Sequence, residues 1–111
     1  MKEKALTYYT DEQIKLANIA KALGHPARIA IIDFLLKQKS CVCGDIVDEL
    51  PLAQATVSQH LKELKSVGLV SGTIEGVKVC YCINTKAWNE IIPFFTEFVN
   101  DATQCINEDC C

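Results

Sequence analysis

The sequence predicts a mainly α-helical domain of about five helices that carries one small β-hairpin. Two observations support this prediction. Apolar residues recur every three or four positions through most of residues 11–67 and again after residue 85, as on amphipathic helices. Between these stretches, Val79, Tyr81 and Ile83 alternate with other side chains at the two-residue period of a strand. A chain of 111 residues suits a single domain.

The first two helices are predicted over residues 11–23 and 26–37. Thr10 and Gln13 have the spacing of a capping box at the start of the first helix. The Gly24–His25 break is followed by Pro26, a residue favoured at the first position of a new helix. The apolar faces expected to pack inward comprise Ile14, Ala17, Ala20 and Leu23 on the first helix, and Ile29, Ile32, Leu35 and Leu36 on the second.

A short third helix is expected over residues 40–50, capped by Ser40 and stopped by Pro51. Its apolar residues are spaced four apart: Val42, Ile46 and Leu50. The fourth helix is expected over residues 53–67, and Gly68 is placed to end it. Its buried stripe consists of Val57, Leu61 and Leu64.

A hairpin and a last helix complete the predicted order. Gly72 and the Glu75–Gly76 pair supply turn residues for the hairpin. Thr85 is placed to cap a helix over residues 86–101, in which Pro93 predicts a kink. The expected organisation is therefore one domain over residues 1–101 and a mobile, cysteine-containing tail over residues 102–111.

The last helix holds more apolar surface than one side of a monomer can bury, so we expect it to form a dimer interface. These apolar residues are Trp88, Ile91, Ile92, Phe94, Phe95, Phe98 and Val99. A ligand pocket between the aromatic side chains is the alternative.

The order helix, short helix, tight turn, helix, hairpin is that of a winged helix-turn-helix, a fold that reads DNA. Small and polar side chains face outward on the fourth helix, as entry into a major groove requires. An ordinary solvated helix face is the alternative, whereas His60, near the buried stripe, is interpreted as a structural hydrogen-bonding residue. The residues expected to contact DNA are Gln54, Thr56, Ser58, Gln59, Lys62, Lys65 and Lys78.

The net charge of −3 does not favour nucleic acid binding, but the negative charge is unevenly placed. Five acidic residues and one lysine lie in residues 84–111, away from the predicted DNA-reading segment. No apolar run is long enough for a membrane helix, and the first residues lack an apolar signal region. We therefore expect a cytoplasmic protein without a membrane partner, in which the seven cysteines are reduced and serve as metal or redox groups.

Three stretches together resemble the ArsR/SmtB family of metal-sensing repressors: LANIAKALGHPARIAIIDFL, SCVCGDIVDEL and QATVSQHLKELKSVGLV. The resemblance covers about residues 13–100. It implies a homodimer formed by the first and last helices, binding to double-stranded operator DNA without ligand, and release when metal binds. The C-V-C at Cys41 and Cys43 matches the family's arsenic-type signature, although Ile46 stands where a third cysteine often follows. The cysteines and histidines of the family's zinc, cadmium and lead sites are missing.

The spacing of Cys41 and Cys43 predicts a switch, if both lie in the first turn of a helix. The helix dipole there favours the thiolate, and thiolates select thiophilic ions. Residues two apart on an α-helix point about 200° away from each other, so one small ion held by both would unwind the turn. The expected inducer is arsenite or antimonite, with no constitutive cofactor. The third sulfur is expected from Cys105, Cys110 or Cys111 of either subunit, or from a small thiol. These three cysteines also offer a separate site of their own.

Several alternatives remain open at this stage. The alternative signals are thiol oxidation, sulfide, and a soft divalent metal such as cadmium or lead. Cys80 and Cys82 are interpreted as ordinary wing residues, with an ion site or a redox pair as the alternative. A metal storage protein is a further alternative. No paired acids, no Ser-His-Asp arrangement and no βαβ pattern are visible, so we do not expect an enzyme.

Overall fold

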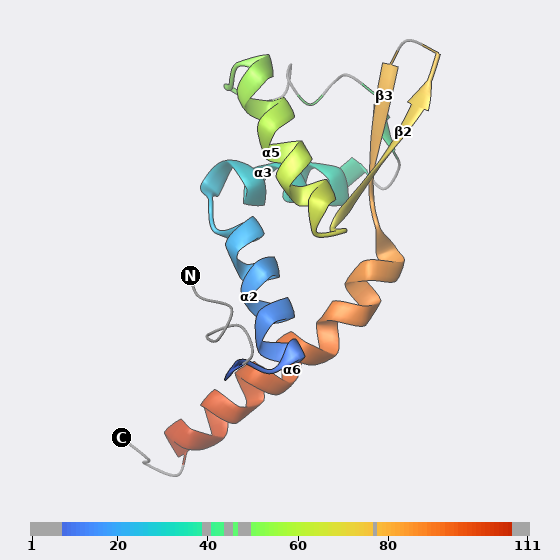
Figure 1. Ribbon diagram of the computed structural model, residues 1–111. Coiled ribbons are helices and arrows are strands. Elements are labelled where there is room, and N and C mark those ends of the chain that lie inside the picture. The colour runs from blue at the N-terminus through green and yellow to red at the C-terminus, as the bar shows by residue number, and fades with distance from the viewer. Residues whose placement is uncertain (1–7, 39–40, 44–45, 47–49, 77, 108–111) are drawn as a thin grey trace.

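The computed structural model describes residues 8–38, 41–43, 46, 50–76 and 78–107. Within them the predicted mainly α-helical fold with a β-hairpin is confirmed (Figure 1). The elements are α2 (Asp11–Leu23), α3 (Pro26–Gln38), β1 (Val42–Cys43), α5 (Gln54–Ser66), β2 (Val70–Glu75), β3 (Lys78–Ile83) and α6 (Thr85–Asn107).

The molecule has two distinct ends. Helices α3 and α5 gather with the sheet at one end, and α2 extends from them to meet the second half of α6 at the other (Figure 1). We call these the sheet end and the helical end. None of the described helices is both long and apolar enough to cross a membrane.

The sheet has the order β1-β3-β2, and both pairs are antiparallel. Strands β2 and β3 form the predicted hairpin, in register from Val70 opposite Ile83 to Glu75 opposite Lys78. Gly76 has a φ of +64°, a left-handed conformation that glycine adopts without steric cost, so the turn predicted at Glu75–Gly76 is confirmed. Gly72, also expected at a turn, lies within β2 opposite Tyr81. Strand β1 lies against the other edge of β3, which makes β3 the central strand.

The start of α2 and the end of α5 form as the sequence predicts. The Gln13 backbone N–H donates to Thr10 Oγ1 at 3.0 Å, and the Thr10 N–H donates to Gln13 Oε1 at 3.0 Å. At the end of α5, Gly68 adopts a φ of +84°. Its backbone N–H donates to the Lys65 carbonyl, and the backbone N–H of Leu69 donates to the Leu64 carbonyl. This pair of bonds is a Schellman motif, and it turns the chain directly from α5 into β2.

One hydrophobic core joins the helices to the sheet. It includes the predicted residues Ile32, Leu35, Val57, Leu61 and Leu64. Ile29 and Leu36 were expected inside but are half exposed, because α3 turns Ile31 and Ala27 inward instead. The residues of the core cluster are Ile19, Ile31, Ile32, Leu35, Val42, Ile46, Val57, Leu61, Leu64, Leu69, Val70 and Ile91.

The predicted third helix is wrong at its beginning. Val42 and Cys43 form β1 and pair with Tyr81 and Cys80 of β3. The four-residue spacing of Val42 and Ile46 arises because both residues reach the core, the first from a strand. Ser40 and the remaining positions 44–45 and 47–49 lie outside the described residues.

The last helix differs from the prediction at both ends. It begins at Thr85, and the side chain of Asn84, not that of Thr85, accepts the backbone N–H of Ala87 at 3.2 Å. The helix continues to Asn107, so residues 102–107 are helical and do not belong to a tail. Residues 108–111 lie outside the described part of the chain.

Candidate nucleic-acid interface and cysteine cluster

Helix α5 divides cleanly into an inner and an outer face. Val57, Leu61 and Leu64 are buried, as predicted, and His60 is buried beside them. The outer face is polar and carries two exposed lysines in the second half of the helix. The exposed side chains include the predicted Gln54, Thr56, Ser58, Gln59, Lys62 and Lys65. The helix therefore offers small and polar groups on the side that faces away from the core.

Two interactions organise this outer face. Gln59 Nε2 donates to Glu63 Oε1 at 3.3 Å, which orients the amide along the helix. Lys65 approaches the hairpin, since its Nζ lies 3.4 Å from the position that a Cβ on Gly72 would take. The predicted Lys78 is the first residue of β3, next to the turn, at the end of the hairpin farthest from α6 (Figure 1). The structure thus brings the outer face of α5 and the hairpin to the same end of the molecule.

A polar cluster joins α5 to α2 and α3. The Arg28 Nε donates to His60 Nδ1 at 3.0 Å, and Arg28 Nη1 donates to the Ala22 carbonyl at 3.2 Å. The His25 ring lies 4.5 Å from the His60 ring and accepts the Ala27 N–H, which caps the start of α3. Burial lowers the pKa of His60, and the nearby His25 and Arg28 lower it further. His60 is therefore a structural hydrogen-bonding residue, as interpreted from the sequence.

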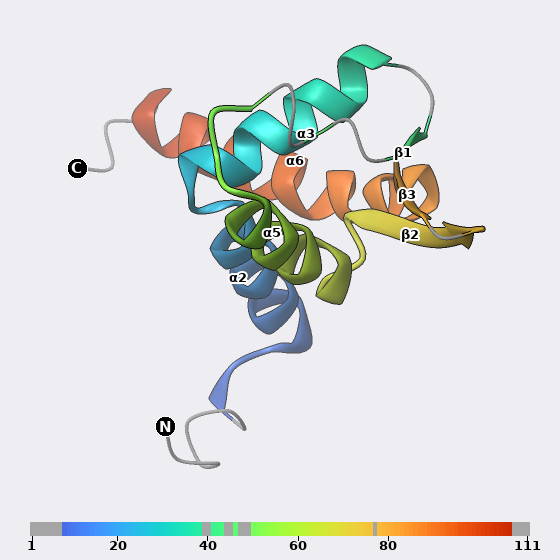
Figure 2. The ribbon, with the colours of Figure 1, turned by 90° about the horizontal axis from the view of Figure 1, so that it is seen from above.

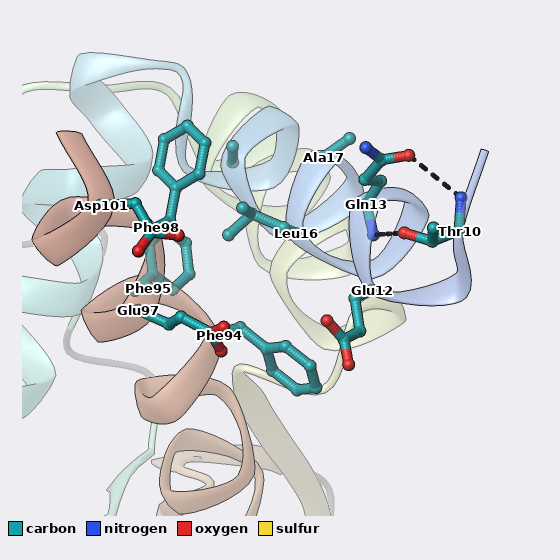
Figure 3. Close-up of a pocket in the computed structure, with 11 residues that line it drawn as sticks. Thr10, Glu12, Gln13, Leu16, Ala17, Phe94, Phe95, Glu97, Phe98 and Asp101 are labelled. Atoms are coloured by element: carbon teal, nitrogen blue, oxygen red, sulfur yellow. Dashed lines mark hydrogen bonds between the residues drawn. The ribbon is translucent and has the colours of Figure 1, made fainter. Parts of the chain in front are cut away.

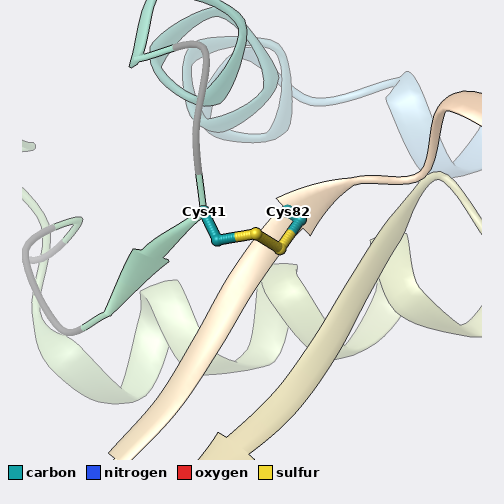
Figure 4. The surroundings of a disulfide bond; sticks show 2 residues. All are labelled: Cys41 and Cys82. Atoms are coloured by element: carbon teal, nitrogen blue, oxygen red, sulfur yellow. A yellow bond between two sulfur atoms is a disulfide. The ribbon is translucent and has the colours of Figure 1, made fainter.

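Strand β1 brings two cysteine pairs together across the sheet. Cys41 forms a disulfide with Cys82 of β3, with their Cα atoms 4.4 Å apart (Figure 4). The next pair in register is Cys43 opposite Cys80. Cys80 is 1% exposed and is also disulfide-bonded. The sequence favoured ordinary wing residues for Cys80 and Cys82, with an ion site or a redox pair as the alternative. The pairing of β1 with β3 places them opposite Cys43 and Cys41. We call these four residues the strand cysteines.

The extended conformation of β1 overturns the predicted switch. Residues two apart on a strand lie on the same face, whereas on a helix they point in nearly opposite directions. Cys41 precedes β1 and Cys43 ends it, so no helix exists there to be unwound. Cys41 and Cys43 therefore have the spacing of residues that share one face of a strand, and no unwinding of a helix is needed to bring that about.

The C-terminal cysteines belong to the other end of the molecule. Cys105 lies in the last turns of α6 and is partly buried and disulfide-bonded. The end of α6 lies at the helical end, far from β1, in both views of the ribbon (Figures 1 and 2). Cys110 and Cys111 lie outside the described residues. Among the described side chains, no three His, Cys, Asp or Glu residues converge on one point as a preformed metal site.

The helical end is apolar and hollow. Helices α2 and α6 enclose an open cavity of about 550 Å³, with the phenyl rings of α6 facing Leu16 of α2 (Figure 3). Ala17 and Ala20, predicted to face the core, are exposed residues that line this cavity instead. The α6 residues Phe98, Val99 and Ile106 are each more than half exposed. The surface thus combines exposed aromatic and aliphatic side chains with the acidic residues Glu12, Glu97 and Asp101, which also line the cavity.

Comparisons with known proteins agree with this arrangement. Residues 25–71 match the family described as bacterial regulatory protein, arsR family. An HTH-type transcriptional regulator of Methanocaldococcus jannaschii is 42% identical over 84 residues, which cover 75% of this chain and 93% of the relative. The arsenical resistance operon repressor of Staphylococcus xylosus is 30% identical over 93 residues, covering 84% and 81%. An ArsR-like transcriptional regulator from Rhodococcus sp. RHA1 superposes with a TM-score of 0.72 at 18% identity, covering 89% and 92%, and so shares the fold.

Proposed function

This chain belongs to the ArsR family of bacterial regulatory proteins and is a transcriptional repressor, and we propose that it releases operator DNA when its cysteines bind trivalent arsenic or antimony. The observation that supports the proposal is that Cys41 and Cys43 lie two residues apart on an extended segment, the spacing at which strand residues share a face. Two thiolates on one face suit a soft, thiophilic ion. The relative named for arsenical resistance supports the same class of inducer.

DNA recognition is assigned to the outer face of α5 and to the hairpin as its wing. Gln54, Thr56, Ser58 and Gln59 are exposed toward the first half of the helix and suit contacts to base edges in a major groove. Lys62 and Lys65 follow, and with Lys78 near the wing tip they suit contacts to phosphates. The buried His60–Arg28 bond holds this helix at a fixed angle to α3, which a reading helix requires.

The repressor acts as a homodimer in this proposal, joined through α2 and α6. Their shared apolar surface is exposed in the single chain, and a second copy would cover it. Two wings and two copies of α5 would then contact the two half-sites of a palindromic operator.

A second candidate signal is thiol oxidation, because Cys41 and Cys82 are joined in a disulfide. Disulfides in cytosolic proteins are usually transient and redox-sensing. Oxidation would then replace the ion in joining β1 to β3, and the oxidant would be the inducer.

An operator-release titration tests these proposals. The duplex is selected in vitro from random sequences by the reduced wild-type protein, and arsenite, antimonite, cadmium and hydrogen peroxide are then titrated against the complex. Cys41→Ser with Cys43→Ser should bind DNA normally but lose release by arsenite. The matched control changes Cys105, Cys110 and Cys111 to serine, and its response shows whether the C-terminal cysteines supply a ligand. Normal release by the Cys41/Cys43 variant contradicts the proposed site, and release by peroxide alone favours the redox signal.

A further inference from the structure

The strand cysteines form two opposed C-x-C sequences on neighbouring antiparallel strands. Cys41 lies opposite Cys82 and Cys43 lies opposite Cys80, although the chain positions are about forty residues apart. Because residues two apart on a strand share a face, all four belong to one face of the sheet. On β2 the same rows continue with Ser71 opposite Cys82 and Thr73 opposite Cys80. The pairing therefore gathers four sulfur-bearing residues where the sequence shows two separate pairs.

We infer that the wing cysteines Cys80 and Cys82 complete the inducer site begun by Cys41 and Cys43, in place of the C-terminal cysteines. The inference rests on the proposed function and names its remaining ligands. Trivalent arsenic takes three sulfur ligands, and any three of the strand cysteines supply them. A divalent ion such as cadmium would use all four, since thiophilic divalent ions accept a tetrahedral set of thiolates.

The distances of the sheet fit this role. Directly opposite residues in an antiparallel pair have Cβ atoms about 4.5–5.5 Å apart, and diagonal neighbours lie at about 7–8 Å. The Cα atoms of Cys41 and Cys82 are 4.4 Å apart, close to the roughly 4.5 Å of a directly opposite, non-hydrogen-bonded pair, and their sulfurs are bonded. Once reduced, the two sulfurs need only separate slightly to hold an ion between them. Burial of Cys80 shields one side of the site from water.

The site forms only after the disulfide opens. An external dithiol donates two electrons and two protons to each protein disulfide. The protein disulfide becomes two thiols, and the external dithiol becomes a disulfide. Arsenous acid then exchanges its three hydroxyl groups for three thiolates. Three As–S bonds form, three As–O bonds break, and the three thiol protons leave with the hydroxides as three waters. Arsenic stays trivalent throughout.

Such a site would fasten β1 to β3, the central strand of the sheet and one arm of the wing. The chain passes from β1 to α5 within the next ten positions, so the same bond restrains the entry to the reading helix. Ion binding would therefore change how the wing and α5 sit relative to each other, without unwinding a helix. An ion held at the C-terminal end of α6 has no such direct connection.

The test compares ligand sets in the reduced protein, from which the reductant has been removed under nitrogen. Arsenite is added, the thiols are alkylated with iodoacetamide, and each cysteine is quantified by mass spectrometry. Arsenite should protect Cys41, Cys43 and at least one of Cys80 and Cys82. The Cys80→Ser/Cys82→Ser protein should bind arsenite at least tenfold more weakly than the wild type does. Binding is measured by the ultraviolet absorbance of the sulfur-to-arsenic bonds. The variant with serine at positions 105, 110 and 111 should bind as the wild type does.

Two further measurements separate the possible failures. If wild-type protein is not released from operator DNA by arsenite, the proposed function fails, whatever the ligands are. If arsenite releases the DNA normally but Cys80 and Cys82 are alkylated as fast with arsenite as without it, this inference fails and the proposed function stands. Because Cys80 is buried, Cys82→Ser by itself and the alkylation pattern of the wild type provide answers that do not depend on the folding of the double variant.

Discussion

The sheet end and the helical end differ in how completely a single chain buries its apolar side chains and pairs its strand edges. At the sheet end, α5 is held by buried leucines and by the Arg28–His60 hydrogen bond, and β1 closes the open edge of β3. At the helical end, α2 and α6 leave a cavity and several half-exposed apolar side chains. The difference fits the separate tasks proposed above, in which the sheet end reads DNA and senses the inducer and the helical end packs against a second copy.

Opening the Cys41–Cys82 disulfide tests how much the sheet end depends on its cross-link. The disulfide closes a loop of 41 residues, and a bridge of this kind stabilises by about 2–4 kcal/mol through the unfolded chain. We expect the oxidised protein to unfold at higher urea than the reduced protein. The gain should be smaller in Cys82→Ser, which lacks this bridge but keeps the disulfide of Cys80. The Cys105→Ser variant is the control, since it leaves this bridge in place. An equal oxidised-to-reduced difference in wild type and Cys82→Ser would rule out the stabilising role.

Phe98→Glu tests the incomplete surface of the helical end. Phe98 is 62% exposed in the single chain, so the change should leave the fold intact while placing a carboxylate in the proposed interface. We expect the dimer dissociation constant to rise at least tenfold, about 1.4 kcal/mol, as measured by sedimentation equilibrium. Thr96→Glu adds the same charge at another exposed position of α6 and serves as the matched control. Equal dissociation constants for the two variants would place the interface elsewhere.

The smallest effect concerns the buried polar cluster at the sheet end. Because the pKa of His60 is lowered in the folded protein, the unfolded chain binds the proton more readily. Stability contributed by neutral His60 is therefore full above about pH 6.5, the ordinary histidine value, and is lost as the pH falls below it. Melting temperatures measured from pH 8 to pH 5 should decline less steeply in His60→Gln, which keeps an acceptor for Arg28. Identical slopes would show that other groups govern the acid response.

The sequence predicted most of the fold because its signals are local. The capping box at Thr10, the helix start at Pro26, the Schellman glycine Gly68 and the turn at Gly76 each act within a few residues. The inner stripe of α5 follows from helical periodicity alone. Local chemistry of this kind is what a single sequence carries most directly.

The cysteine cluster was missed because its cause is not local. The spacing of Val42 and Ile46 fits a helix, and the pairing that makes residues 42–43 a strand comes from β3, far along the chain. Treating Cys41 and Cys43 as helical led to the wrong conclusion that they point apart. The sequence does contain a signal for the cluster, because C-x-C occurs both at residues 41–43 and at residues 80–82. Antiparallel pairing of two such segments places the four cysteines opposite one another.

The end of α6 was misjudged for a different reason. Residues 102–107 lack an apolar stripe, so periodicity gives no helix there, yet the helix continues through them. The hydroxyl of Thr103 donates to the Val99 carbonyl at 2.9 Å, a helical contact that hydropathy does not report.

The Leu69 carbonyl oxygen accepts two hydrogen bonds, from the Asn84 backbone at 3.2 Å and from Trp88 Nε1 at 3.1 Å. These bonds attach Leu69, which directly precedes β2, to the beginning of α6. In a dimer built on α6, the angle between the two long helices would consequently set the span between the two wings. Substitutions that alter subunit packing could thereby retune the preferred half-site spacing without touching any residue that meets a base.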